Sequence, residues 1–255
     1  FSLLIGDRVS CSKFIYIPEG YSFFGDSLGD IKIQLSGFYI QKTEVSNKEF
    51  LKFCQETSWQ YPEHLIRRDS YSTHDDQPVV NVSFIDASNY CKWLNSKYKK
   101  SSSKEQWKCL LPSEAQWEKA CRLGFPFLYP QGELSHNFNT LFIRKQGEPE
   151  KVMRLSHDIA VSGVMGLGGN VSEWCIDGWT DKPENLVSKR DIDPILSNKK
   201  DTRKVIKGTT YFSNSPKEFQ IYYRQAREPG NFDKALGLRP VVFTKNKNYK
   251  KLISE

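Results

Sequence analysis

Apolar residues recur with the period of an α-helix in three stretches: SNKEFLKFCQET from Ser46, SFIDASNYCKWLN from Ser83 and LPSEAQWEKACR around Ser113. In the first and third, a Glu or Gln three residues after the serine completes a capping box, which satisfies free N–H groups of the first turn. In the second, Asp86 places a carboxylate at the positive end of the helix. The pattern predicts three helices that bury aromatic and cysteine side chains.

Short apolar runs elsewhere predict brief β-strands. They read GFYIQKTEV, QPVVNVS, VIKGTTYFS, IYYRQAR and LGLRPVVF, and long segments of neither period separate them. Residues 123–165 and 177–203 show little periodicity, so aromatic packing or bound ions must hold them in place of regular hydrogen bonding. The pattern predicts an irregular α+β domain and argues against a doubly wound sheet.

The length and composition allow one large domain or two small ones. The chain has 255 residues, 38% hydrophobic and 13% aromatic, which suits a core of large planar side chains. No apolar run approaches the roughly 18 residues that span a bilayer. We expect one domain over residues 1–244 and a basic, flexible tail over residues 245–255. Because the first residue is Phe, we also expect a processed chain or a piece of a longer protein.

Charge and cysteine usage narrow the classes of partner and metal. The net charge of +7 comes partly from the tail, and without a basic stripe or an RNA-binding signature we expect no nucleic-acid partner. The six cysteines form no C-x-x-C pair and the four histidines are scattered, which argues against zinc. Cys54, Cys91 and Cys121 fall on apolar helix faces. Buried free thiols are therefore expected over disulfides, which favours the cytoplasm, with the cell surface or secretion as alternatives.

Six blocks of the sequence, in order, carry a resemblance to a known family. They read GFYIQKTEVSNKEFLKF, QPVVNVSFIDASNYCKWLN, LPSEAQWEKACR, GGNVSEW, KGTTYFS and LGLRPVV, and they lie between Gly37 and Val242. In them the chain resembles the formylglycine-generating enzyme (sulfatase-modifying factor) family, which reads P-V-V-x-V-S-W-x-D-A-x-x-Y-C-x-W-L, A-G-N-V-W-E-W and G-F-R at three of these places. The resemblance implies a single C-type-lectin-like domain of α+β class with little regular secondary structure.

The family uses this scaffold for several functions. Some members oxidise a sulfatase cysteine to formylglycine with copper and oxygen, and related domains couple sulfur to histidine derivatives on non-haem iron. Others are binding modules, including domains attached to bacterial serine/threonine kinases and surface receptors diversified by retroelements. In the copper enzymes two cysteines, five residues apart, follow a G-G-S-[FY] segment, because thiolates suit copper(I). Counted from Gly208, these positions hold Ser213 and Glu218 here.

These replacements favour a domain without the copper chemistry. The His-x-x-x-His-x-Glu arrangement of the iron-dependent relatives is also absent from the sequence. A Ser213–His157 pair depends on tertiary folding that the sequence does not show. Glu114 and Glu118 share one helix face, and the resemblance makes them structural, with Glu114 bonded to backbone near the helix start.

We therefore expect a non-catalytic binding module, one domain of a larger bacterial protein such as a serine/threonine kinase, that needs no cofactor. The alternatives are a retroelement-diversified surface receptor, with variable positions between Thr209 and Leu236, and an oxidoreductase with an altered active site. The expected partner is a protein or peptide, and the oligomeric state stays open. The expected groove lies beside the lost cysteines and comprises Thr210, Tyr211, Ser213, Tyr222, Tyr223 and Arg227.

The segment GLGGNVSEWCIDGW raises the question of a metal site. It has no nucleotide-binding spacing and no following lysine. By the resemblance, a calcium ion would use a side chain at position 166, the carbonyls of Gly169 and Val171, and the carboxylate of Glu173. Position 166 is Gly166, so one ligand is lost, and we expect at most a weak calcium site.

The alternative is that Glu173 bonds to backbone amides or to an arginine such as Arg227 or Arg239. Arg224, Arg227 and Arg239 lie among apolar residues and are expected to brace loop carbonyls; the alternative role is a carboxylate-binding groove. Asn81 and Asn170 each begin Asn-Val-Ser, a nominal glycosylation acceptor. Because both fall inside core blocks, we expect their side chains to bond loop backbone.

Overall fold

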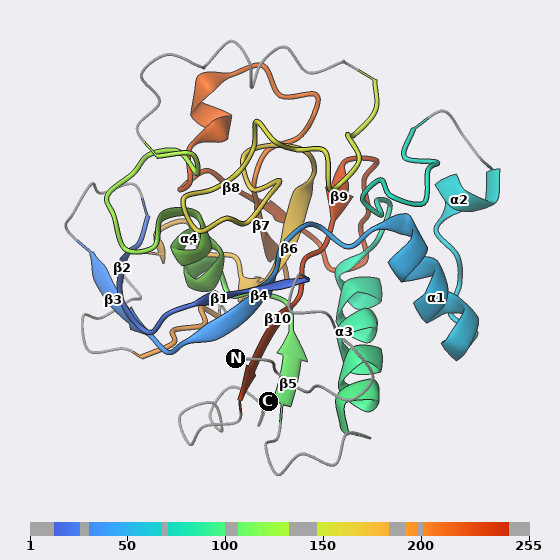
Figure 1. Ribbon diagram of the computed structural model, residues 1–255, viewed down its shortest axis with the longest axis horizontal. Coiled ribbons are helices and arrows are strands. Elements are labelled where there is room, and N and C mark those ends of the chain that lie inside the picture. Colours follow the sequence, from blue (N-terminus) through green and yellow to red (C-terminus); the bar gives the residue numbers. More distant parts are fainter. Residues whose placement is uncertain are drawn as a thin grey trace.

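The computed structural model describes residues 13–25, 31–67, 71–99, 107–132, 147–183, 192–197 and 201–244. Within them, short strands form two four-stranded sheets and one two-stranded sheet, with the helices packed around them (Figure 1). The expected tail over residues 245–255 lies outside the described residues. None of the described helices is long and apolar enough to cross a membrane. The arrangement is the irregular α+β fold that the pattern predicts.

The first sheet joins the two ends of the described chain. It contains β1 (Phe14–Ile17), β4 (Phe38–Gln41), β10 (Val241–Thr244) and β5 (Trp107–Leu110), in that order. All three pairings are antiparallel. Because β10 lies between β4 and β5, the last described strand closes a sheet begun by the first.

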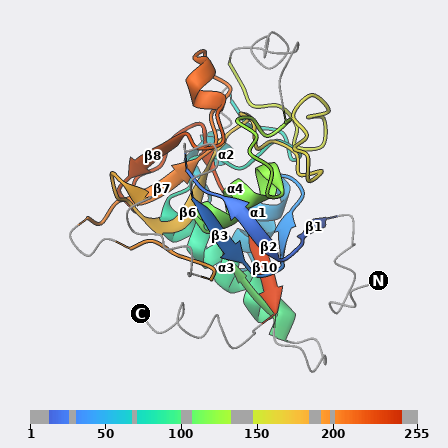
Figure 2. The ribbon, with the colours of Figure 1, turned by 90° about the vertical axis from the view of Figure 1, so that its left-hand side faces the viewer.

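The second sheet contains part of the glycine-rich segment. One of its strands leads into the loop that has Ser213 and Glu218 at the positions of the copper cysteines. Its order is β8 (Arg224–Arg227), β7 (Lys204–Lys207), β6 (Ser172–Gly178) and β9 (Leu236–Gly237). Figure 2 shows β6, β7 and β8 side by side, below the turn of η2 (Pro216–Phe219). β2 (Gly20–Phe23) and β3 (Lys32–Leu35) form the two-stranded sheet.

The three predicted helices begin where their capping residues indicate. α1 (Asn47–Thr57) and α4 (Glu114–Arg122) have complete capping boxes, at Ser46 and at Ser113. α3 (Phe84–Lys99) follows Ser83, whose backbone N–H and hydroxyl both donate to the Asp86 carboxylate. The sequence did not single out the short α2 (Glu63–Arg67).

The strand predictions are only partly confirmed. Four of the five apolar runs contain strands, but QPVVNVS makes a single bridge, between Pro78 and Ser46. Asn81 in this run has a φ of 53°, which breaks an extended strand. β1, β2, β3 and β5 lie outside the predicted runs, because four-residue strands are too short to show a period.

Two apolar cores meet at β6. Trp174 packs into the core of α1 and α3, and the next residue, Cys175, packs into the core of α4 and β1, because successive side chains of a strand point to opposite faces. The expectation of buried free thiols is confirmed for the described cysteines, while Cys11 lies outside the described residues. The buried free thiols belong to Cys54, Cys91, Cys109, Cys121 and Cys175.

Candidate functional site

The loop at the position of the copper cysteines is held by hydroxyl groups. Ser213 accepts a hydrogen bond from the Thr210 backbone N–H at 3.2 Å and from the Thr209 hydroxyl. Glu218 lies on η2, the next turn of chain. His157 lies 3.3 Å from the Glu150 carboxylate, so its described partner is a glutamate rather than Ser213. The Ser213 hydroxyl therefore closes a turn instead of facing a base.

The expected groove residues divide between surface and interior. Thr210, Tyr222 and Tyr223 are half-buried, and Arg227 lies 3.4 Å from the Asp233 carboxylate. Tyr211 was expected to line the groove, but it is buried, with only 3% of it accessible. The exposed aromatic residue of this loop is Phe212, with the Lys234 amine 4.4 Å from its ring centre.

Tyr211 packs inward because apolar residues from three distant segments surround it. It joins Val80, Val171 and Ala235 in a small buried cluster. Its hydroxyl donates to the Lys234 carbonyl at 3.3 Å, and burial raises its pKa. The sequence could not show this, because the three neighbours lie just before α3, β6 and β9, in segments that are separate from the Tyr211 loop.

Glu173, the carboxylate expected to hold calcium, is buried and bonded to an arginine. Arg239 donates to it through Nε at 3.0 Å and through Nη2 at 2.7 Å, and the Trp117 indole N–H donates at 2.9 Å. Arg239 also donates to the carbonyls of Gln41 and Met165, each at 2.9 Å. This is the arginine alternative that the sequence left open, and it confirms that Arg239 braces loop carbonyls.

A second buried carboxylate occupies the space beside Gly166. A Cβ atom added at Gly166 would lie 2.5 Å from Oε1 of Glu44, and Gly166 has a φ of 79°. An Asn or Asp at this position would therefore displace Glu44. Within the described residues, no three His, Cys, Asp or Glu side chains gather as metal ligands. Calcium binding stays a prediction that rests on the resemblance.

Glu44 itself has an unusual environment. It is fully buried, and its two carboxylate oxygens have no hydrogen-bond partner among the residues that the structure describes, while the nearest guanidinium nitrogen of Arg239 is 3.9 Å away. Burial is the main reason that its pKa rises to about 8; the charge of Arg239 lowers the pKa, and the neighbouring Glu173 and Asp158 raise it. Glu44 is therefore a carboxylic acid that keeps its proton at neutral pH.

Glu114 and Glu118 form an ionic network rather than a catalytic pair. Arg224 donates to both oxygens of Glu114, at 2.7 and 2.8 Å. Lys207 donates to Glu118 at 2.9 Å and lies 3.5 Å from Glu114, while Arg122 donates to Glu118 at 3.2 Å. Each carboxylate is thus matched by cations, which is the condition for stable burial of charge. The network ties α4 to β7 and β8.

The expectation that Glu114 bonds backbone was wrong. The backbone N–H of Glu114 instead donates to the Asp177 carboxylate at 2.8 Å, and the Leu196 N–H donates to the same residue at 2.8 Å. Burial raises the pKa of Asp177 to about 7. Glu114 is free to pair with Arg224 because Asp177, which lies on β6, supplies the acceptor at the helix start.

The two Asn-Val-Ser asparagines behave differently. The Asn170 side chain is buried and bonds the backbone of Glu150 twice, at 2.9 and 3.1 Å, which confirms the structural interpretation. Asn81 donates to the Tyr71 hydroxyl at 2.8 Å rather than to backbone.

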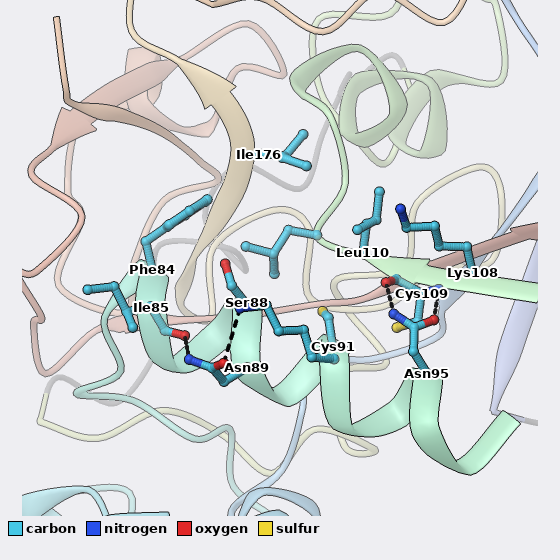
Figure 3. Close-up of a pocket in the computed structure, with 12 residues that line it drawn as sticks. Phe84, Ile85, Ser88, Asn89, Cys91, Asn95, Lys108, Cys109, Leu110 and Ile176 are labelled. Carbon is cyan, nitrogen blue, oxygen red and sulfur yellow. Dashed lines mark hydrogen bonds between the residues drawn. The ribbon is translucent and has the colours of Figure 1, made fainter. Parts of the chain in front are cut away.

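Two hollows lie away from the expected groove. One, of about 490 Å³, is lined by α3, β5 and β6, and Figure 3 shows it. The other, of about 430 Å³, is lined by α2, by Phe50 of α1, by residues 60–62 between these helices and by Phe232, among others. None of the expected groove residues lines either hollow. No local pattern could indicate them, because their walls come from segments far apart in the sequence.

Comparison with known proteins matches most of the chain to one family. The family model of the sulfatase-modifying factor enzyme 1-like domain matches residues 2–243. Serine/threonine-protein kinase Pkn1 of Chlamydia trachomatis is 26% identical over 233 residues, which cover 84% of this chain and 34% of the kinase. Formylglycine-generating enzyme of Mus musculus is 25% identical over 238 residues, 68% of this chain and 60% of the enzyme. The chain thus spans about a third of the length of the Chlamydia kinase.

Solved structures show the same fold. PvdO from Pseudomonas aeruginosa superposes with a TM-score of 0.70 at 19% sequence identity, over 90% of this chain and 93% of PvdO. Treponema denticola variable protein 1 superposes with a TM-score of 0.69 at 18% identity, over 89% of this chain and 94% of that chain. At these identities the likeness establishes the architecture and leaves the activity to be argued from the site.

Proposed function

The chain belongs to the family of sulfatase-modifying factor enzyme 1-like domains, and on this premise we propose that it is a non-catalytic binding module of a larger protein. The observation that carries the proposal is the loop after β7, where Ser213 and Glu218 stand at the positions of the copper cysteines. Neither a hydroxyl nor a carboxylate supplies the soft sulfur that copper(I) requires.

The geometry of this loop supports a structural role for its hydroxyl groups. Ser213 bonds to Thr209 and to the Thr210 backbone N–H, so its oxygen already serves the turn. The nearby buried charges are also paired, with Lys207 and Arg224 matched to the carboxylates of α4. Charges satisfied in this way hold a scaffold together and leave few groups ready for proton transfer.

The larger protein in this proposal is a bacterial serine/threonine kinase. The support is the similarity to Pkn1 of Chlamydia trachomatis, of which this chain would form about a third. The gene sequence around this domain distinguishes the possibilities. A kinase domain in the same reading frame supports the proposal, whereas a lipoprotein signal directly before the domain favours a surface receptor.

A protein or peptide is the proposed ligand, bound at the surface of the loop after β7. Exposed Phe212 and half-buried Tyr222 and Tyr223 offer aromatic contacts, and Arg227 on β8 offers a cation whose side chain is 38% exposed. Aromatic and arginine side chains commonly anchor protein interfaces. Tyr211 is left out of this surface because it is buried.

A copper titration with a matched variant tests the absence of copper chemistry. We expect the native chain to bind no copper(I) in competition with a chelator and to leave the cysteine of a sulfatase peptide unconverted. The double variant Ser213→Cys/Glu218→Cys should bind copper(I) at least about 100-fold more tightly, because it restores two thiolates. Ser213→Cys alone is the control for a single thiolate.

Formylglycine formed by the native chain would overturn the proposal, as would native copper affinity equal to that of the double variant. Circular dichroism of each variant checks that the fold is intact. The peptide assay is read by mass spectrometry, so it reports conversion independently of copper affinity.

A further inference from the structure

A cleft between α3, β5 and β6 has the size of a small-molecule site. Its volume of about 490 Å³ falls within the range of about 300–1,000 Å³ typical of ligand pockets. Figure 3 shows α3 as its base, with Ser88 pointing up from the helix. Five aliphatic and aromatic side chains line it: Phe84, Ile85, Leu110, Leu111 and Ile176.

The base of the cleft adds two thiols to these apolar walls. Cys91 of α3 and Cys109 of β5 both line it. Burial raises the pKa of Cys109 well above its usual range, so its sulfur stays neutral at physiological pH. A neutral thiol behaves as a small, polarisable apolar group. The base therefore suits an apolar occupant.

The edge of β5 beside the cleft is closed to a peptide strand at its centre. The Asn95 side chain donates to the Cys109 carbonyl at 2.8 Å and accepts from the Cys109 N–H at 2.7 Å (Figure 3). An added strand would need these two backbone groups for its ladder of hydrogen bonds. Because Asn95 already pairs both, an occupant must bind through apolar contact and charge.

The charged residues among the described lining residues of the cleft are cations. Lys92 and Lys108 are among these described residues, which include no Asp or Glu. The Lys204 amine lies nearby, 4.8 Å from the Phe84 ring centre and 3.0 Å from the Ile176 carbonyl, to which it donates. Apolar walls beneath ammonium groups match a molecule that has an apolar body and an anionic group.

We propose that this cleft binds a small apolar acid, such as a medium-chain fatty acid or an aromatic acid. The apolar body lies between α3 and β6, over the thiols of Cys91 and Cys109, and the anionic group faces Lys92 and Lys108. The site is separate from the loop after β7, because none of the loop's residues lines the cleft. The inference stands whether or not that loop binds a peptide.

The test uses two fluorescent probes of similar body that differ in charge. 1-Anilinonaphthalene-8-sulfonate carries a sulfonate, and N-phenyl-1-naphthylamine lacks it. We expect the native chain to bind one equivalent of the sulfonate saturably at low ionic strength. We expect dodecanoate to displace it, because both molecules combine an apolar body with an anion.

Three variants locate the binding. Ser88→Trp fills the cleft and should abolish the binding of both probes. Lys92→Glu/Lys108→Glu should weaken the sulfonate about tenfold at low salt and leave the uncharged probe within about twofold, because only the sulfonate experiences the reversed charge. Lys48→Glu/Lys52→Glu makes the same change of net charge on α1, away from the cleft, and should leave both affinities within about twofold.

Several outcomes would overturn the inference. The first is the absence of saturable binding of both the sulfonate and dodecanoate, the latter followed by calorimetry. The second is native affinity in Ser88→Trp while its circular dichroism and unfolding midpoint stay close to native. The third is equal weakening by the two double lysine variants, which would make the effect one of total charge.

Discussion

At the scale of single residues, buried carboxyl groups explain which residues stand at positions 239 and 166. Arg239 joins Glu173 to the carbonyls of Gln41, at the end of β4, and Met165, and Glu44 fills the space that a side chain at position 166 would need. The resemblance suggests that Gly166 marks a lost ligand. The structure gives a packing reason for the glycine, because the carboxylate that it accommodates comes from a distant segment.

The protonation of Glu44 predicts a particular dependence of stability on pH. Arg239, Glu173 and Asp158 face this carboxyl, and its pKa of about 8 lies above the ordinary 4.5. The folded chain therefore holds this proton more tightly than the unfolded chain does. The contribution of this proton to the free energy of unfolding is complete below about pH 4.5 and is lost as the pH rises through about 8.

Glu44→Gln keeps the shape of the side chain and removes its titration. Between pH 5 and pH 8, native stability should fall more than the stability of the variant, by a margin on the order of a few kcal/mol. Urea unfolding at several pH values measures the difference. Parallel pH profiles would contradict the assignment. Asp177, whose pKa is raised in the same direction, is unchanged in both proteins.

A comparison of alanine substitutions at two glycines separates the free-energy cost of backbone strain from that of side-chain contact. Gly166 and Gly25 have φ angles of 79° and 78°, but a Cβ atom at Gly25 meets nothing within 4 Å. Gly25→Ala should cost about 1–2 kcal/mol from the left-handed backbone alone. Gly166→Ala should cost about 2 kcal/mol more, because Glu44 has to move. If urea unfolding shows equal losses of stability in the two variants, Glu44 moves aside at no cost and the packing explanation is contradicted.

At the scale of elements, local signals determine where the helices begin, whereas contacts with distant segments determine where the strands form. The serine caps of α1, α3 and α4 act within one turn, so the sequence shows where these helices begin. β5 depends instead on β10, about 130 residues later, and on Asn95 of α3 for its outer edge. Neither partner can be read from the four residues of the strand.

The edge of β5 offers a prediction at this scale. Asn95→Ala leaves the N–H and C=O groups of Cys109 without their side-chain partner, and it should cost about 1–3 kcal/mol of stability. Hydrogen exchange at the Cys109 amide should also become faster. Asn89→Ala on the same helix removes two bonds at the surface, one to the Ile85 carbonyl and one from the Lys92 amine, and should change stability by less than about 0.5 kcal/mol. Equal effects of the two variants would contradict the role given to Asn95.

At the scale of the whole molecule, β10 and the ionic network around α4 hold irregular segments together. β10 brings the end of the described chain between β4 and β5, while Lys207 and Arg224 connect α4 to the second sheet. The two apolar cores meet across β6. The described cysteines are all free thiols, so they add no disulfide to this framework.

Thiol reactivity tests this arrangement across the molecule. In the native state, 5,5′-dithiobis(2-nitrobenzoate) should react rapidly with at most one of the six cysteines, because the five described thiols are buried. In guanidinium without reductant, all six should react. A count of four after unfolding would reveal a disulfide and contradict the free thiols.

The sequence by itself determined the family resemblance, the three capped helices, the buried thiols and the absence of the copper cysteines. These features depend on residue identity and on interactions within one turn of helix. The tertiary structure decided which charges pair, that Tyr211 is buried, why Gly166 carries no side chain, and that a cleft opens between α3 and β5. These features arise between segments far apart in the chain, and no local period or propensity encodes which segments meet.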